Sequence, residues 1–271
     1  MLYFISTPIG NLNDISLRAI DVIRSCDYLY AEDTRTTKKL LNFIKCNKKC
    51  LSFYDHNEDQ ISFDIIDKIK KNKIISIVSD AGTPAISDPG YKLIKECIRQ
   101  SINYTLIPGP SSVTNAIVMS GLPTDKFSFF GFMPKKKSEQ KVLFENLRND
   151  TKTLIFFDSP KRIQKTISNL IEFIGVDRRI AICREMTKLH EEIIRGSLKD
   201  VIDNIKTNKI LLRGEIVLVI EGSKKNQIDY FINSKIKNEF LNKLSASDAA
   251  KLISLITGQN KRNIYKYLIE D

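Results

Sequence analysis

Four short segments of the sequence carry polar residues and glycines where a ligand could bind. They read TPIGNLNDIS (7–16), AEDTR (31–35), SDAGTPAISDPG (79–90) and PGPSS (108–112). Each follows an apolar run typical of a strand, and in parallel α/β proteins such loops meet at the carboxyl edge of the sheet, where ligands bind. The first loop has one glycine, whereas a dinucleotide-binding loop needs three and a phosphate loop needs Gly-Lys-Ser/Thr. The four loops therefore predict a cleft for something other than a bare phosphate.

The third loop offers a carboxylate beside exposed backbone. Asp80 stands where a strand ends, and Gly82 with the following Thr-Pro permits a tight backbone course close to a ligand. This combination suits a ligand with hydroxyls, an amine or a positive charge, and S-adenosylmethionine has all three. In PGPSS, Ser111 and Ser112 begin a helix, where they either bind a carboxylate or the adenosine edge or simply cap the helix.

Charged residues gather at three strand ends, one of them in the second of these loops. In AEDTR, Asp33 and Arg35 either form a plain ion pair or face a substrate at the cleft. In FFDSPKR, Lys161 and Arg162 follow a strand end, where they could meet an RNA phosphate. Glu185 belongs to a third charged strand end, in CREMTK.

The elements that position these loops form two α/β units and a helical tail. Strand-like and helical segments alternate over residues 1–110, which predicts an N-terminal α/β domain with a mostly parallel sheet. We expect its strands at 3–6, 28–31, 74–79 and 104–107 and its helices at 15–24, 36–44, 61–71 and 90–100. Residues 111–222 predict a linking helix and a second α/β domain with a mixed or antiparallel sheet, in which PKKKSEQ (134–140) forms a basic loop.

Residues 223–271 predict a small helical segment. A capped helix is expected from about Ser247, with a stop at Gly258 and a second helix from about residue 260. Lys261, Arg262 and Lys266 lie near one another on the second helix. They either contact nucleic acid or form the solvated face of a pair of helices that packs on its own domain or on another subunit.

Composition limits the class of protein. With 271 residues, 42% of them hydrophobic, the chain can bury a sizeable core. The net charge of +11 favours a polyanionic partner such as nucleic acid, although lysine-rich composition from nucleotide bias gives the same excess. We expect a cytoplasmic protein, because no apolar run has the length of a membrane helix and the start does not resemble a secretory signal. Five scattered cysteines predict reduced thiols, and no metal site is expected.

Taken in order, the motifs resemble a known family. STPIGNLNDIS, AEDTR, YDHNE, VSDAGTPAISDPG, PGPSS, CREMTK and GEIVLVIEG together are similar to the ribosomal RNA small subunit methyltransferase I branch of the tetrapyrrole methylase superfamily, over essentially the full chain. The resemblance implies two α/β domains with S-adenosylmethionine in the cleft between them and a homodimer. It also implies 2′-O-methylation of a cytidine ribose in small-subunit (16S) ribosomal RNA.

Roles are expected at individual positions, and the resemblance carries over those of the cofactor-binding residues. Asp33, Arg35 and Glu185 are expected to line the reacting oxygen as catalytic residues, with His56 as an alternative base. Asp158 and Lys161 are departures, because the family commonly has Glu and His in the motif that reads FFDSPKR here. The expected RNA-binding residues are Lys161, Arg162, Lys261, Arg262 and Lys266. The expected cofactor-binding residues are Pro8, Gly10, Asp80, Gly82, Pro84, Ala85, Ser111, Ser112 and Gly214.

Two other functions remain open. One is C-methylation of a tetrapyrrole precursor, but enzymes of that kind have a first loop with several glycines that ends in Asp, whereas this chain has TPIGNLND. The other is a non-catalytic RNA-binding factor in ribosome assembly.

Overall fold

The computed structural model describes residues 1–54, 56–207, 213–224 and 234–269. Its first sheet is entirely parallel, with strand order β3-β2-β4-β1-β5. Because the strands are parallel, the loops that follow β1, β2, β4 and β5 all leave from one edge of the sheet. The strands are β1 (Leu2–Ile5), β2 (Tyr28–Ala31), β3 (Cys50–Ser52), β4 (Ile75–Val78) and β5 (Tyr104–Ile107).

Helices cover both faces of this sheet. Successive strand residues point to opposite faces, so Ile5 packs in one apolar cluster and Phe4 in another. The cluster around Ile5 includes side chains of α1 (Leu17–Ser25) and α2 (Thr34–Phe43). The cluster around Phe4 includes side chains of α3 (Glu58–Lys70) and α4 (Tyr91–Arg99). A short 3-10 helix, η1 (Leu12–Asp14), precedes α1.

A buried carboxylate fixes the start of α4. The residue before this helix is Gly90, which has no side chain to cap the first N–H groups. Glu58, at the start of α3 and 4% exposed, supplies the acceptor instead. Its Oε1 accepts hydrogen bonds from the backbone N–H groups of Gly90, Lys92 and Leu93 at 3.0, 2.8 and 3.3 Å. A carboxylate at this position also interacts favourably with the helix dipole, so Glu58 anchors the end of the long loop after β4.

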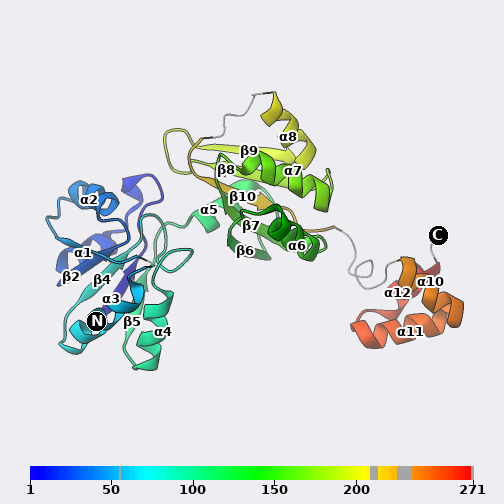
Figure 1. Ribbon diagram of the computed structural model, residues 1–271, viewed down its shortest axis with the longest axis horizontal. Coiled ribbons are helices and arrows are strands. Elements are labelled where there is room, and N and C mark those ends of the chain that lie inside the picture. The colour runs from blue at the N-terminus through cyan, green and yellow to red at the C-terminus, as the bar shows by residue number, and fades with distance from the viewer. Residues whose placement is uncertain (55, 208–212, 225–233, 270–271) are drawn as a thin grey trace.

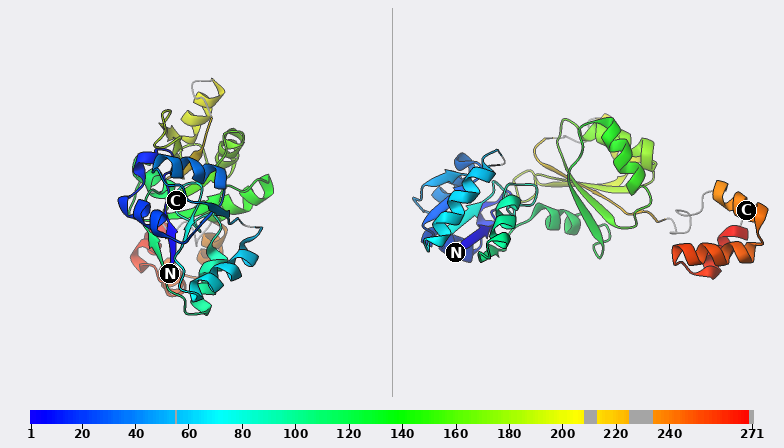
Figure 2. Two further views of the ribbon diagram at one scale, coloured as in Figure 1. Left: turned by 90° about the vertical axis from the view of Figure 1, so that its left-hand side faces the viewer. Right: turned by 60° about the horizontal axis from the view of Figure 1, so that its bottom comes forward.

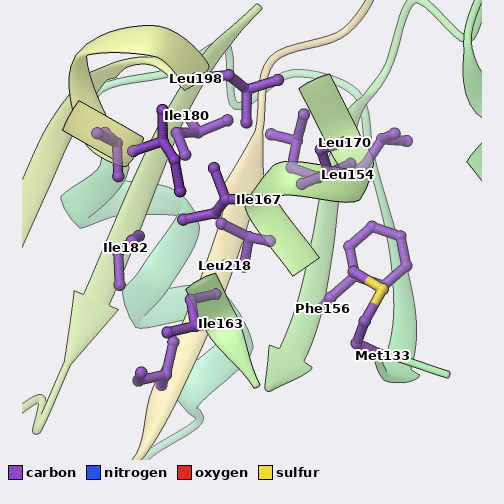
Figure 3. Close-up of a cluster of buried hydrophobic side chains, with 14 of the residues drawn as sticks. Met133, Leu154, Phe156, Ile163, Ile167, Leu170, Ile180, Ile182, Leu198 and Leu218 are labelled. Carbon is purple, nitrogen blue, oxygen red and sulfur yellow. The ribbon is translucent and has the colours of Figure 1, made fainter. Parts of the chain in front are cut away.

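The second sheet is mixed, with order β6-β7-β10-β8-β9. Only β6 and β7 are parallel, and the other neighbours are antiparallel. One face packs against α6 (Lys137–Leu147), α7 (Ile163–Ile174) and α8 (Leu198–Lys206) in an apolar cluster, part of which Figure 3 shows. The strands are β6 (Phe127–Phe132), β7 (Thr153–Asp158), β8 (Arg179–Arg184), β9 (Glu192–Ser197) and β10 (Ile216–Ile220).

The other face of the second sheet joins the two units. It packs against α5 (Ser112–Ser120), and the same apolar cluster includes Ile9 from the loop after β1. Figure 1 shows the two sheets side by side with α5 between them, and the second view in Figure 2 agrees. The first loop of the chain therefore lies where the two sheets meet.

Among the described residues, three helices lie in the C-terminal segment. They are α10 (Ser234–Lys243), α11 (Ala246–Thr257) and α12 (Lys261–Ile269), drawn apart from the two sheets in Figure 1. The Ser245 hydroxyl caps α11, and Gly258 ends that helix in the left-handed conformation, with φ 68°. The stop at Gly258 agrees with expectation, α11 begins slightly before Ser247, and α10 is an additional helix.

The expected fold class is confirmed, with two sheet-and-helix units of α/β type and helices at the C-terminal end. One strand was missed, and one local expectation was wrong. The short strand β3 was not predicted, because CLS is too brief to show a pattern. Part of the expected basic loop, from Lys137, is the first turn of α6. Among the described residues, no helix is long and apolar enough to cross a membrane. The boundaries at 110 and 222 remain a proposal.

Candidate functional site

The loops after β1 and β4 are tied together by their backbones. Thr7 N donates to Gly82 O at 2.8 Å, and Gly82 N donates to Thr7 O at 3.0 Å, so the two residues form an isolated antiparallel bridge. The hydroxyls of Ser6 and Thr83 lie 3.1 Å apart. Pro8 follows Thr7, and Pro84 lies two residues after Gly82. Both prolines are buried. The expected meeting of the loops at one sheet edge therefore occurs in the structure.

Asp80 links the loop after β4 to the loop after β2. Asp33 N donates to Asp80 Oδ1 at 2.9 Å. Burial raises the pKa of the Asp80 carboxyl above its ordinary value, and the nearby Asp33 carboxylate adds to this shift, while the hydrogen bond and Arg35 oppose it. Asp80 is thus a carboxylate whose negative charge the protein only partly compensates.

Asp33 and Arg35 form a local pair at the start of α2. The Asp33 side chain caps the helix by accepting from Arg35 N at 2.8 Å, and Arg35 Nη2 lies 2.7 Å from Asp33 Oδ2. Hydrogen bonds from Arg35 lower the pKa of Asp33 to about 2. The Arg35 side chain is 89% exposed. The plain ion pair, one of the two alternatives left open by the sequence, is therefore present.

A cavity of about 440 Å³ lies beside Asp80 and receives residues from both sheets. Its size is within the range of small-molecule sites. Carboxylates come from both units, with Glu32, Asp80 and Asp88 from the first and Asp158 and Glu215 from the second. Apolar side chains come mostly from the second unit. The lining residues are Ile9, Glu32, Asp80, Ala81, Asp88, Ser112, Phe132, Phe157, Asp158, Ser159, Pro160, Met186, Gly214, Glu215, Ile216 and Val217.

Gly10 lets the first loop touch the second unit. A Cβ atom at this position would lie 2.5 Å from Lys188 Cγ, 2.6 Å from Thr187 Oγ1 and 2.9 Å from Met186 O. Asn11 N also donates to Thr187 Oγ1 at 3.1 Å. The residue type of Gly10 is therefore explained by close packing of the two units, and no side chain longer than hydrogen fits there without displacement.

Gly214 has a similar role on the other side of the cavity. Its φ is +80°, and a Cβ there would lie 2.2 Å from the Glu185 carboxyl carbon. Glu185 Oε1 accepts from Glu215 N at 2.8 Å and from Lys188 Nζ at 2.9 Å. The hydrogen bond from Glu215 N, followed by the Lys188 side chain, lowers the pKa of Glu185. Glu185 thus holds two loops of the second unit together.

Backbone strain gathers in the loops of this region. Ala85, Ser87, Glu185 and Thr187 all have positive φ, at 67°, 63°, 49° and 65°. Non-glycine residues adopt this left-handed region uncommonly, and at a cost. Strained residues of this kind cluster at ligand-binding sites, which supports the assignment of the region as a functional site.

The N-terminus of α5 opens at the cavity. Ser111 occupies the capping position, but its side chain makes no capping hydrogen bond, and Ser112 lines the cavity. The first N–H groups of a helix have no partner within the helix and attract anions. The arrangement therefore offers backbone donors to a negatively charged group of a ligand.

Asp158 and Arg162 form a compensated pair under the cavity. The Asp158 side chain is fully buried, and Arg162 Nη2 lies 2.9 Å from its Oδ1. Thr166 Oγ1 donates to Asp158 Oδ2 at 2.6 Å. Arg162 also donates to Ser159 Oγ and to Met133 O, both at 3.1 Å. The hydrogen bonds of Arg162 are therefore made to groups of the protein itself, whereas Lys161 is exposed.

The structure brings some of the predicted residues together and leaves others apart. Asp80, Ser112 and Gly214 line the cavity. The expected catalytic residues Asp33, Arg35 and Glu185 are beside it without lining it, and His56 is exposed, next to Tyr54. The other cofactor-binding expectations, namely Pro8, Gly10, Gly82, Pro84, Ala85 and Ser111, belong to the loops that carry the lining residues. Lys261, Arg262 and Lys266 are exposed on α12.

Sequence reasoning missed the apolar wall of the cavity. Phe132 and Phe157 come from the ends of β6 and β7, and Met186 follows β8. Their patterns resemble those of ordinary core residues, so no local signal distinguishes them. Among the described residues, no group of three His, Cys, Asp or Glu side chains could hold a metal ion.

Comparisons with known proteins agree with this geometry. The sequence profile described as Tetrapyrrole (Corrin/Porphyrin) Methylases matches residues 1–202. The chain is 43% identical to a Ribosomal RNA small subunit methyltransferase I of Thermotoga maritima, over 82% of this chain and 99% of that protein. It is 36% identical to a protein of the same name from Vibrio cholerae, over 100% of this chain and 95% of the relative. A solved diphthine synthase is similar in fold, with TM-score 0.64 and 18% identity over 81% of this chain and 89% of that one.

Replacing Arg162 tests whether this residue is structural. Arg162→Ala leaves the buried Asp158 carboxylate without its cationic partner, so we expect the free energy of unfolding to fall by about 3 kcal/mol. Lys161→Ala, the matched control, removes the same charge one residue away from an exposed position. It is expected to change stability by less than about 0.5 kcal/mol. Urea unfolding measures both values, and equal effects of the two substitutions would contradict the structural role of Arg162.

Proposed function

The chain belongs to the tetrapyrrole (corrin/porphyrin) methylase family, and we propose that it methylates small-subunit ribosomal RNA with S-adenosylmethionine as the methyl donor. The acceptor in this proposal is the 2′-oxygen of a cytidine ribose. The observation that carries the proposal is the cavity, which residues of both units line with carboxylates and apolar side chains. The names of the relatives from Thermotoga maritima and Vibrio cholerae support ribosomal RNA as the substrate. We propose that the protein acts in the cytoplasm, where ribosomal subunits are assembled.

The residues present fit this methyl donor. Asp80, with Glu32 and Asp88 on the same wall, suits the positive charges and ribose hydroxyls of S-adenosylmethionine. The uncapped start of α5 suits its carboxylate. Ile9, Met186 and neighbouring apolar residues suit the adenine ring.

The reaction proceeds by transfer of a methyl group between two atoms. The donor supplies a methyl group that its sulfonium charge already activates. The carbon–sulfur bond breaks as the carbon–oxygen bond to the ribose forms, and the proton of the 2′-hydroxyl passes to a base or to water. The protein has to align the oxygen with the methyl group and exclude competing water.

The pKa shifts distinguish the candidate residues. Asp33 and Glu185 have lowered pKa values because they accept hydrogen bonds, so both are weak bases. We propose that they act as positioning residues. Asp33 holds the Asp80 carboxylate through its backbone N–H, and Glu185 holds the loop of Gly214. Asp80, by contrast, has a raised pKa and lines the cavity.

Two alternatives have different signatures. C-methylation of a tetrapyrrole precursor predicts methyl transfer to a small macrocycle in the absence of RNA. A non-catalytic assembly factor predicts no binding of S-adenosylmethionine, although the cavity and its strained loops are difficult to explain for such a protein.

We also propose a homodimer, formed through the outer edge of the second sheet. The edge strand β6 exposes Phe127, Phe130 and Phe132, with exposed fractions of 41%, 38% and 63%. An apolar edge strand left in water is prone to aggregation unless something covers it. A second copy of the chain can cover this edge, because a two-fold axis places the same surface of both copies against each other. Because Phe132 also lines the cavity, such a partner would help to close its mouth.

Asp80→Asn tests the cofactor site. The asparagine oxygen can still accept from Asp33 N, but the negative charge is lost. We expect the affinity for S-adenosylmethionine to fall about ten- to hundredfold, the value of a charged hydrogen bond of ~1.5–3 kcal/mol. Because the folded protein raises the pKa of Asp80, the ionised carboxylate costs stability at neutral pH. The free energy of unfolding at pH 7 is therefore expected to stay equal or rise.

Calorimetry and urea unfolding measure these two quantities. Asp59→Asn, which removes an exposed carboxylate paired with Lys92 at 2.7 Å, is the control and should change neither. Unchanged affinity in a folded Asp80→Asn protein would remove Asp80 from the cofactor site.

The substrate is tested with purified chain, S-adenosylmethionine and small ribosomal subunits from cells that lack this protein. We expect incorporation of one methyl group at a cytidine ribose, found by mapping 2′-O-methylated positions. Incorporation at a base, or into a tetrapyrrole precursor alone, would contradict the proposed reaction.

The dimer is tested by light scattering. Phe127→Lys places a charge on the β6 edge and is expected to shift the mass from dimer to monomer, because burying an unpaired charge at an interface is costly. Phe63→Lys is the control, because Phe63 on α3 is 65% exposed and lies on the first unit. A monomeric unmodified chain, or a Phe127→Lys protein that stays dimeric, would overturn the proposal for this edge.

A further inference from the structure

A second hollow lies on the first unit, outside the cavity described above. It has a volume of about 410 Å³ and lies between α2 and the segment that leads to β3. We name it the basic groove. Its lining residues are Thr34, Arg35, Lys38, Leu41, Asn42, Cys46, Asn47, Lys48, Lys49 and Cys50.

The groove is strongly cationic. Residues 34–50 contain six Lys or Arg residues and no Asp or Glu. Lys38 and Lys49 are exposed, and among the described residues no carboxylate lies within ion-pair distance of either. Lys48 donates to the backbone carbonyls of Arg24, at 3.1 Å, and of Cys26, which are neutral acceptors. The acid nearest to this segment in the sequence is Asp33, which pairs with Arg35.

The cations are spaced along the groove. Arg35 and Lys38 are three residues apart on α2, so their side chains lie on one face, about one turn from each other. Lys48 and Lys49 line the groove from the segment that leads to β3. Side-chain amides and a hydroxyl, at Asn42, Asn47 and Thr34, line the same groove. Spaced positive charges with interleaved polar groups suit a chain of repeated negative charges better than a single anion.

One end of the groove lies next to the cofactor cavity. Arg35 and Thr34 begin α2, and the residue before them, Asp33, donates its N–H to Asp80 in the cavity wall. A polyanion that occupies the groove therefore ends beside the place where the methyl group is transferred.

We propose that the basic groove binds the sugar–phosphate backbone of the RNA substrate and guides the target ribose to the cavity. This inference rests on the proposed function and names the surface that the substrate uses. Lys38 and Lys49 contact phosphates, and Arg35 contacts the phosphate nearest to the reacting nucleotide. Phosphate contacts of this kind fix the position of the RNA and carry no base specificity.

The test compares two double variants that lose the same charge. Lys38→Ala/Lys49→Ala empties the groove of its two exposed lysines. Lys70→Ala/Lys95→Ala removes two exposed lysines from α3 and α4, the helices on the opposite face of the first sheet. Binding of the full chain to a fluorescent small-subunit ribosomal RNA fragment is measured over a series of salt concentrations, and thermal unfolding checks that each variant is folded.

Each lost phosphate contact lowers the slope of log affinity against log salt by ~0.7–0.9. We expect the groove variant to lower the slope by about 1.4–1.8 relative to the unmodified chain and to weaken RNA binding most at low salt. The control variant should lower it by less than about 0.5. The affinity for S-adenosylmethionine should be the same in all three proteins, because neither pair lies in the cofactor cavity.

Three results would overturn the groove assignment. The first is an equal salt slope for the unmodified chain and the groove variant, and the second is an equal loss of RNA affinity in the two variants. The third is weaker binding of the groove variant to whole ribosomal subunits with unchanged binding to naked RNA, which would assign the groove to an acidic protein. Failure of the unmodified chain to methylate ribosomal RNA would contradict the proposed reaction only. The salt slopes report on the groove whether or not methyl transfer occurs.

Discussion

The backbone bridge between Thr7 and Gly82 is the constraint from which the rest of the site follows. Two reciprocal hydrogen bonds tie the loop after β1 to the loop after β4, so neither loop can move without breaking backbone bonds. Because the first loop is fixed, Ile9 can enter the apolar cluster of the second sheet. Because the loop after β4 is fixed, Asp80 faces the cavity and its carboxylate lies within hydrogen-bond distance of Asp33 N. The position of one unit against the other thus depends on backbone geometry at the sheet edge.

Two glycines then allow close packing around the cavity, Gly10 between the two units and Gly214 within the second unit. Gly10 allows contact with the loop at 186–188, and Gly214 leaves room for the Glu185 carboxyl group. Both lie on the border between the first loop and the second sheet. The nearby positive φ values at Glu185 and Thr187 persist because hydrogen bonds to Glu215 N and Asn11 N hold these residues from both sides. Close packing therefore maintains the strain that shapes the cavity.

The sequence predicted the parts of the site that depend on local pattern. A polar loop after an apolar run identified Asp80, Ser112 and the first loop, because strand, turn and helix signals all lie within a few residues. It did not identify Phe132 or Met186, which reach the cavity only through strand pairing in the mixed sheet. The position of Arg35 was also beyond local reasoning. Asp33 caps α2, and Arg35, in the first turn of this helix, lines the basic groove.

Asp80 and Asp158 line the same cavity, but they differ in their ion-pair and hydrogen-bond partners. Asp158 has a cationic partner in Arg162 and further hydrogen bonds from Thr166 Oγ1 and Ser159 N. Among the described residues, the Asp80 carboxylate accepts one hydrogen bond, from Asp33 N. Burying a charge without full compensation is costly, so the incomplete set of partners at Asp80 needs a reason. A cationic ligand provides that reason, because it would pair with the Asp80 carboxylate. Asp158 needs no such ligand, because its partners within the protein already compensate its charge.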